Sequence, residues 1–168
     1  MESRSKIFGH PAHTILIVFP LGLLSTSVVF DTLATATKKP KLAEGSFWML
    51  VAGLVGGALA APFGWWDWAA IPKGTRAKRV GLLHGLGNVV VLGLFGASAL
   101  MRRDKIEAPN QTARTLSVAG GGLAFATGWL GGELVDRLGV GVDDGANLNA
   151  SSSLTGKPAA EGTTEPRS

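Results

Sequence analysis

The chain has 168 residues, enough for one domain, and its composition of 46% hydrophobic and 17% charged residues is biased toward membrane proteins. The absence of cysteine excludes disulfides, thiolate ligands, iron–sulfur clusters and thiol nucleophiles. The formal charge of +4 comes from basic residues clustered at the ends of apolar runs, a pattern typical of juxtamembrane segments. Because no basic helix or aromatic ladder accompanies them, we expect no nucleic-acid partner.

Four nearly charge-free apolar runs determine the predicted architecture. A run of about 18 or more apolar residues is long enough to span a bilayer as a helix, and the sequence predicts such helices over about 13–36, 46–68, 80–101 and 113–134. A short polar lead, residues 1–12, precedes the transmembrane domain of residues 13–142. A tail rich in Ser, Thr, Gly, Ala and Pro, residues 143–168, follows it and is predicted to be disordered. The expected fold is an all-α bundle of four transmembrane helices.

The first apolar run begins directly after Gly9-His10-Pro11-Ala12-His13 and contains Pro20 and Asp31. A positively charged start followed by an apolar stretch also resembles a signal peptide. This run is too long for one and contains a proline and a carboxylate, so we expect it to be retained as a helix. In the second run Pro62 predicts a kink, and the tryptophans of residues 65–68 predict an interface with the lipid headgroups.

Four spans place both termini on the same side of the membrane, where the starts of the first and third helices meet the ends of the second and fourth. Seven polar residues are therefore expected near one surface: His10, His13, Asp67, His84, Asn88, Glu133 and Asp136. Asp31 is expected near the opposite surface, roughly 27 Å from His13 along the helix. There it caps the helix or pairs with Lys38 or Lys39. Each surface receives seven Lys and Arg residues, so the positive-inside rule does not assign the cytoplasmic side.

With these residues assembled, the chain resembles a bacterial family known as domain of unknown function 2231, a small four-helix membrane domain. The resemblance covers about residues 8–143 and rests on these segments: His10-Pro11-Ala12-His13 with Pro20, Gly22 and Asp31; residues 61–64 with Asp67; His84 with Asn88; and residues 131–135 leading to 139–142. It implies a fold and a setting beside Rieske-type or other redox modules. It supplies no established reaction.

The first hypothesis for the chemistry is a b-type haem with His13, or His10, and His84 as axial ligands. The first and third helices run parallel, so these histidines begin at similar depth, as a haem held by two histidines between helices requires. Glycines along the helices would give the macrocycle room. Basic residues of the loop before the third helix, Arg76, Lys78 and Arg79, would neutralise its propionates.

A second hypothesis is a metal site in which His10, His13 and His84 are joined by Asp67 or Glu133, a nitrogen and oxygen set suited to zinc or non-haem iron. A third is proton or ion transport through Asp31 and the carboxylates near the termini. The alternative to all three is a structural or assembly subunit, in which Asp31 and Asn88 are polar groups that hold the helices together.

The sequence favours a multi-pass protein of the bacterial inner membrane. Its expected role is a membrane subunit or anchor that supports redox chemistry, with the lipid bilayer, a redox or other membrane protein, or a second copy of the chain as partners. We expect no catalytic activity of its own, because no nucleophile elbow and no catalytic carboxylate pair are recognisable.

Overall fold

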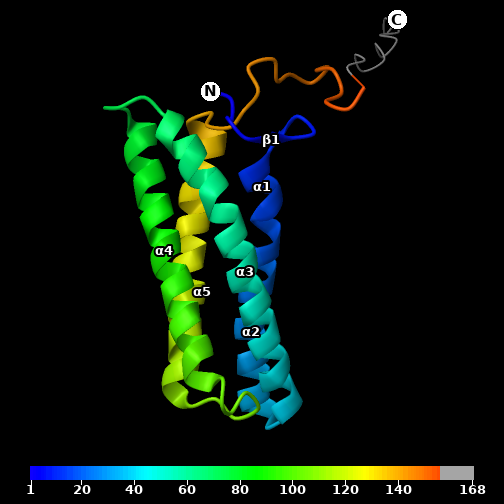
Figure 1. Ribbon diagram of the computed structural model, residues 1–168, viewed down its shortest axis with the longest axis vertical. Coiled ribbons are helices and arrows are strands. Elements are labelled where there is room, and N and C mark those ends of the chain that lie inside the picture. The colour runs from blue at the N-terminus through cyan, green and yellow to red at the C-terminus, as the bar shows by residue number, and fades with distance from the viewer. Residues whose placement is uncertain (156–168) are drawn as a thin grey trace, which may run out of the picture.

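The computed structural model describes residues 1–155 and is mostly helical, which confirms the all-α class (Figure 1). Four long helices form the bundle, and shorter elements extend it at one end. The long helices are α2 (Val18–Thr37), α3 (Pro40–Ala70), α4 (Arg76–Arg102) and α5 (Gln111–Gly132). The shorter ones are β1 (Lys6–Ile7), β2 (His10–Pro11), α1 (Ala12–Leu16) and the π-helical turn η1 (Glu133–Arg137).

Proline sets the shape of the first and second helices. The first helical segment is divided at Ile17 into α1 and α2. Pro20 explains the division, because it has no N–H to donate to the carbonyl of Leu16 and its ring crowds that carbonyl. Pro62, by contrast, lies inside α3 without ending it.

The helix ends follow local capping rules. Lys38 adopts a left-handed conformation (φ 57°) that ends α2, and Pro40 starts α3, six residues before the expected position, because proline suits the first turn of a helix. The side chains of Thr75 and Asn110 accept hydrogen bonds from first-turn amides of α4 and α5.

Three helical segments are long and apolar enough to cross a membrane: Ala12–Thr37, Pro40–Ala70 and Arg76–Arg102. Their large apolar side chains, such as Phe19, Leu59 and Val90, are exposed, whereas the most buried positions include many Ala, Ser and Gly residues. This distribution is typical of helices that pack closely against one another and face lipid.

The bundle is built from two helical hairpins. The most extensive pairings are α2 with α3 and α4 with α5, and an apolar cluster of Leu24, Leu50, Val91 and Phe95 lies between the hairpins. Met1 and the last described residues lie at one end of the bundle, the terminal end. The α2–α3 and α4–α5 connections lie at the other, the loop end (Figure 1).

A small cap covers the terminal end. β1 and β2 pair antiparallel through a turn in which Phe8 and Gly9 both have positive φ. Residues 143–155, the described part of the tail, form turns and bends. The remainder of the predicted disordered tail lies outside the described residues.

Candidate functional site

His13 is oriented by α3. Its Nδ1 lies 3.0 Å from the backbone oxygen of Ala60. A carbonyl oxygen only accepts hydrogen bonds, so Nδ1 carries the proton, and in the neutral ring Nε2 has the free lone pair. Gly64 provides the space for the imidazole, because a Cβ at that position would lie 2.8 Å from His13 Cε1.

His84 is held in the same way by α5 and also by a neighbour on its own helix. Its Nδ1 donates to the backbone oxygen of Thr127 (2.8 Å), and its Nε2 lies 3.2 Å from Asn88 Nδ2. The Thr127 hydroxyl donates to Asn88 Oδ1 (3.0 Å), which closes a ring of hydrogen bonds. In this arrangement the His84 imidazole is neutral, with the proton on Nδ1. A Cβ at Gly131 would lie 3.1 Å from His84 Cε1.

The two imidazoles face each other across the interior of the terminal end. Their ring centroids are 6.3 Å apart and their planes are nearly perpendicular, at 85°. Two imidazoles that share one metal ion have ring centres about 6 Å apart, because each metal–nitrogen bond is about 2.0–2.1 Å long. Backbone carbonyls on the other ring nitrogens are also the usual outer partners of metal-binding histidines. The spacing of the pair therefore suits a single shared metal centre, although Nε2 of His84 is directed at Asn88 in this structure.

The other predicted ligands have separate partners. His10 lies in the exposed cap, with Nε2 3.2 Å from the hydroxyl oxygen of Ser153. Asp67 accepts hydrogen bonds from the Ser3 hydroxyl (2.7 Å) and the Arg4 amide (2.8 Å). His10 therefore belongs to the N-terminal lead itself, and Asp67 attaches that lead to α3. Within residues 1–155, no group of three or more His, Asp or Glu side chains is placed to hold a metal ion.

Two basic side chains at the start of α4 also have protein partners already. Arg76 pairs with Glu133 at 2.6 Å, which accounts for the last predicted metal ligand. The Lys78 ammonium lies 3.8 Å from the centre of a Trp68 ring and donates to the Trp68 carbonyl (2.7 Å). Of the three residues expected to neutralise haem propionates, two therefore already bind protein groups.

The N-terminal lead and the segment after η1 are joined above the histidine pair. The Met1 ammonium donates to the Gly139 carbonyl, and the Met1 carbonyl accepts from the Gly141 amide, both at 2.8 Å. We call residues 1–11 and 139–155 together the terminal cap. Because Asp67 anchors the lead to α3, the cap is fastened to the bundle at the end where His13 and His84 lie.

Ion pairs in the terminal cap shift three pKa values. The Lys6 ammonium bonds Glu2 at 2.6 Å and Asp143 at 3.4 Å. The hydrogen bond from Lys6 holds the pKa of Glu2 below its ordinary value, and in return Glu2 raises the pKa of Lys6. The Gly145 amide, followed by Lys6, lowers the pKa of Asp143.

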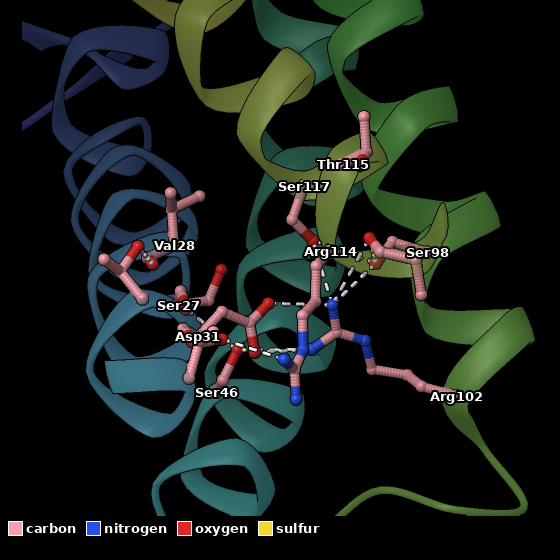
Figure 2. Close-up of polar contacts among 12 residues, drawn as sticks. Ser27, Val28, Asp31, Ser46, Ser98, Arg102, Arg114, Thr115 and Ser117 are labelled. Atoms are coloured by element: carbon pink, nitrogen blue, oxygen red, sulfur yellow. Dashed lines mark hydrogen bonds and ion pairs between the residues drawn. The ribbon is translucent and has the colours of Figure 1, made fainter. Parts of the chain in front are cut away.

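A buried ion pair occupies the loop end of the same interior. Figure 2 shows the Arg102 guanidinium of α4 against the Asp31 carboxylate of α2. The contact is bidentate, at 3.0 and 2.8 Å, and the two side chains are 0% and 3% exposed. Three buried hydroxyls complete the surroundings of the guanidinium: Ser46 at 3.3 Å, Ser98 at 2.9 Å and Ser117 at 3.2 Å.

This partner of Asp31 was not predicted from the sequence. Lys38 and Lys39 were the expected partners, but both are exposed beyond the end of α2. Arg102 is one of the basic residues that follow an apolar run, and such residues are expected at the membrane surface. Because α4 continues to Arg102, whose side chain is fully buried, this last side chain reaches across the interior of the bundle to Asp31 on α2.

The histidine pair and the ion pair are separated by apolar side chains. Leu24, Leu50, Val91 and Phe95 fill the interior between them. Two hollows of the described chain lie at the loop end, one lined by residues 104–108 and the other by residues of the α2–α3 turn and Arg114. Neither reaches the histidines, so a ring-sized cofactor requires α1 and α4 to separate at the terminal end.

Comparison with known proteins places the chain in a family. Residues 9–144 match a family described as predicted membrane protein (DUF2231). No curated protein and no solved structure matches the chain. Because the match covers the whole bundle and both polar pairs, the chain belongs to this family of predicted membrane proteins.

Proposed function

We propose that the chain is a multi-pass protein of the bacterial inner membrane in which α5 is the fourth span and both termini lie on the same side. At 22 residues α5 is about 33 Å long, sufficient for the hydrocarbon core. It packs extensively along α4 and exposes Val118, Phe125 and Trp129. Its glycines lower its hydropathy, but glycine is common in membrane helices.

Within this bundle, His13 and His84 hold one metal centre, the iron of a b-type haem, and the protein is a membrane subunit that supports redox chemistry. The observation that carries this proposal is the pair of imidazoles 6.3 Å apart, each oriented by a backbone carbonyl of the other helix in its hairpin. A haem bound there would supply one-electron transfer.

The protein's own groups have defined tasks in this proposal. The Ala60 and Thr127 carbonyls fix the tautomer of each ring, so that Nε2 is the nitrogen left for the metal. On the His84 side, Asn88 must release Nε2 before a metal binds. In the Asn88→Ala variant, Nε2 of His84 loses its amide partner, so we expect this variant to retain the bound metal centre.

The alternative function is a structural or assembly subunit. The closed ring of hydrogen bonds among His84, Asn88 and Thr127 favours it, because both imidazole nitrogens are already satisfied without a metal. Ion transport has less support, because the apolar cluster separates the two polar pairs. A site with carboxylate ligands also has less support, because Asp67 and Glu133 bind other groups.

The experiment is an absorbance spectrum of protein purified in mild detergent, oxidised and then reduced with dithionite, with metal analysis of the same sample. We expect a Soret band and sharpened bands on reduction, with one iron per chain. His13→Ala and His84→Ala should each abolish the signal. His10→Ala should retain it, because His10 lies in the exposed cap.

Two results distinguish the alternatives. A colourless protein that carries one metal ion per chain, lost in both interior histidine variants, identifies a bare ion between the imidazoles. A colourless, metal-free protein that gains no signal when haem is added to the membranes contradicts the proposal and supports the structural subunit.

A further inference from the structure

The first helices of the two hairpins present the same buried positions at a constant spacing. Four pairs of residues, each 71 positions apart, line the interior in the same order from the terminal end: His13 and His84, Leu24 and Phe95, Ser27 and Ser98, Asp31 and Arg102. Leu24 and Phe95 belong to the central apolar cluster, and Ser27 and Ser98 are fully buried. The α1–α2 segment and α4 therefore share one pattern of inward positions.

The second helices, α3 and α5, repeat their contacts to those positions at a spacing of 67. A Cβ on Gly53 would lie 2.7 Å from the side chain of Leu24, and a Cβ on Gly120 would lie 2.9 Å from that of Phe95. The glycines are 67 positions apart, and the residues they approach are 71 apart.

The contacts to the histidines follow the same rule. Gly64 and Gly131, again 67 apart, make room for His13 and His84. Ala60 and Thr127, also 67 apart, supply the carbonyls that accept from the two Nδ1 atoms. Because the offset is the same for all three pairs, α3 and α5 present equivalent faces to the first helices.

We propose that the bundle consists of two copies of one helical hairpin, and that the Asp31–Arg102 pair makes the two unlike copies pair with each other. At most matched positions the halves carry similar residues, so their inner faces would also fit a like half of a second chain. At this one matched position the charges are opposite. Two first halves would bury aspartate against aspartate, and two second halves arginine against arginine, which the low dielectric of the interior strongly disfavours.

The proposal gives the ion pair a role in specificity. A buried polar or charged pair adds little net stability over an apolar pair, but it excludes arrangements that leave a charge unpaired. In this protein it selects the assembly of α1–α2 and α3 with the unlike hairpin, α4 and α5. Each hairpin therefore packs its inner face, made of the matched positions, against the inner face of the other hairpin.

The first test exchanges the charges in the full-length chain. Asp31→Arg and Arg102→Asp should each lower the melting temperature in detergent by about 10 °C or more. The double variant D31R/R102D restores the pair at equivalent positions and should recover at least half of that loss. The exposed cluster at the same end, in which Lys41 pairs with both Glu44 and Glu107, provides the control, so K41E/E44K/E107K should leave the melting temperature unchanged. A double variant no more stable than the single ones overturns the proposal.

The second test mixes the single variants. The D31R chain has arginine in both halves and the R102D chain has aspartate in both. Co-expressed with different tags, they should exchange hairpins and co-purify as a one-to-one dimer with raised stability. The connection 71–75 spans about 17 Å when extended, which permits the exchange. The pairing role is contradicted if the two chains purify apart and D31R/R102D also fails to recover its melting temperature. Association of either single variant with itself contradicts the charge rule.

Discussion

Arg102 and Asp31 illustrate how a charged residue can be stable inside a membrane protein. The two terminal nitrogens of the guanidinium lie within hydrogen-bond distance of six oxygens, two of the Asp31 carboxylate, three of serine hydroxyls and one of the Ala113 carbonyl, which share their four N–H groups. Its third nitrogen, Nε, is buried without a partner in the described chain. The pairing and the hydroxyls offset much of the desolvation cost of burial. Removing one partner leaves the other charge buried and unpaired.

Asp31→Ala is therefore expected to destabilise the protein by about 3–5 kcal/mol. Thermal unfolding in detergent, followed by circular dichroism, measures the effect. Lys41→Ala is the matched control, because Lys41 is exposed and pairs with Glu44 and Glu107 at the same end, and it should change stability by no more than about 0.5 kcal/mol. Equal effects of the two substitutions would show that the buried pair is not energetically distinct.

The sequence predicted the position of polar residues along the bundle better than the residues that they contact. The apolar runs identify the helices, and Pro20, His13 and His84 could be placed at the right ends from helix length alone. The partner of Asp31 could not be predicted in this way, because Arg102 sits at a helix end where charged residues normally face the surface. The signal was present in the matched pairs Ser27-xxx-Asp31 and Ser98-xxx-Arg102, which become informative only when the two hairpins are compared.

At the scale of the helices, glycine decides how closely each imidazole approaches its partner helix. A Cβ on Gly64 would clash with the His13 ring, and a Cβ on Gly131 would make a tight contact with the His84 ring. Gly122 lies on the exposed side of α5, where a Cβ would meet nothing within 4 Å. The same residue type therefore has different roles on the inner and outer faces, and composition alone does not separate them.

Gly64→Ala is expected to displace the His13 ring and cost about 1–3 kcal/mol through overpacking. Gly131→Ala should act in the same direction with a smaller effect, because its nearest ring atom is 3.1 Å away instead of 2.8 Å. Gly122→Ala should be neutral or slightly stabilising. Melting temperatures of the three variants, together with the absorbance of any bound centre, test this order. The expectation fails if Gly64→Ala is as well tolerated as Gly122→Ala.

At the scale of the whole molecule, the two ends of the described chain are joined over one end of the bundle. Residues 1–11 and 139–155 contact each other through backbone hydrogen bonds and the ion pairs of Lys6. Because Asp67 holds the lead onto α3, the cap is attached at the end of the bundle where the histidine pair lies.

The ion pairs make the attachment of this cap dependent on pH. The pKa values of Glu2 and Asp143 are lowered in the folded protein, so their contribution is present above their ordinary values and is lost as the pH falls through the lowered ones. We therefore expect the cap to loosen below about pH 4 and to be intact at neutral pH. Hydrogen exchange of the Gly141 amide, corrected for its intrinsic rate, measures the loosening. In Lys6→Gln this pH dependence should be reduced, and an unchanged dependence would contradict the assignment.

The hairpin pairing and the position of the histidine pair both require that all four long helices cross the membrane. The chain has no cysteine, so single cysteines at positions 2, 104 and 150 report sidedness without background. Labelling of intact spheroplasts with an impermeant maleimide should place positions 2 and 150 on one side and position 104 on the other. If position 150 instead reacts like position 104, α5 does not cross the membrane and the account is contradicted.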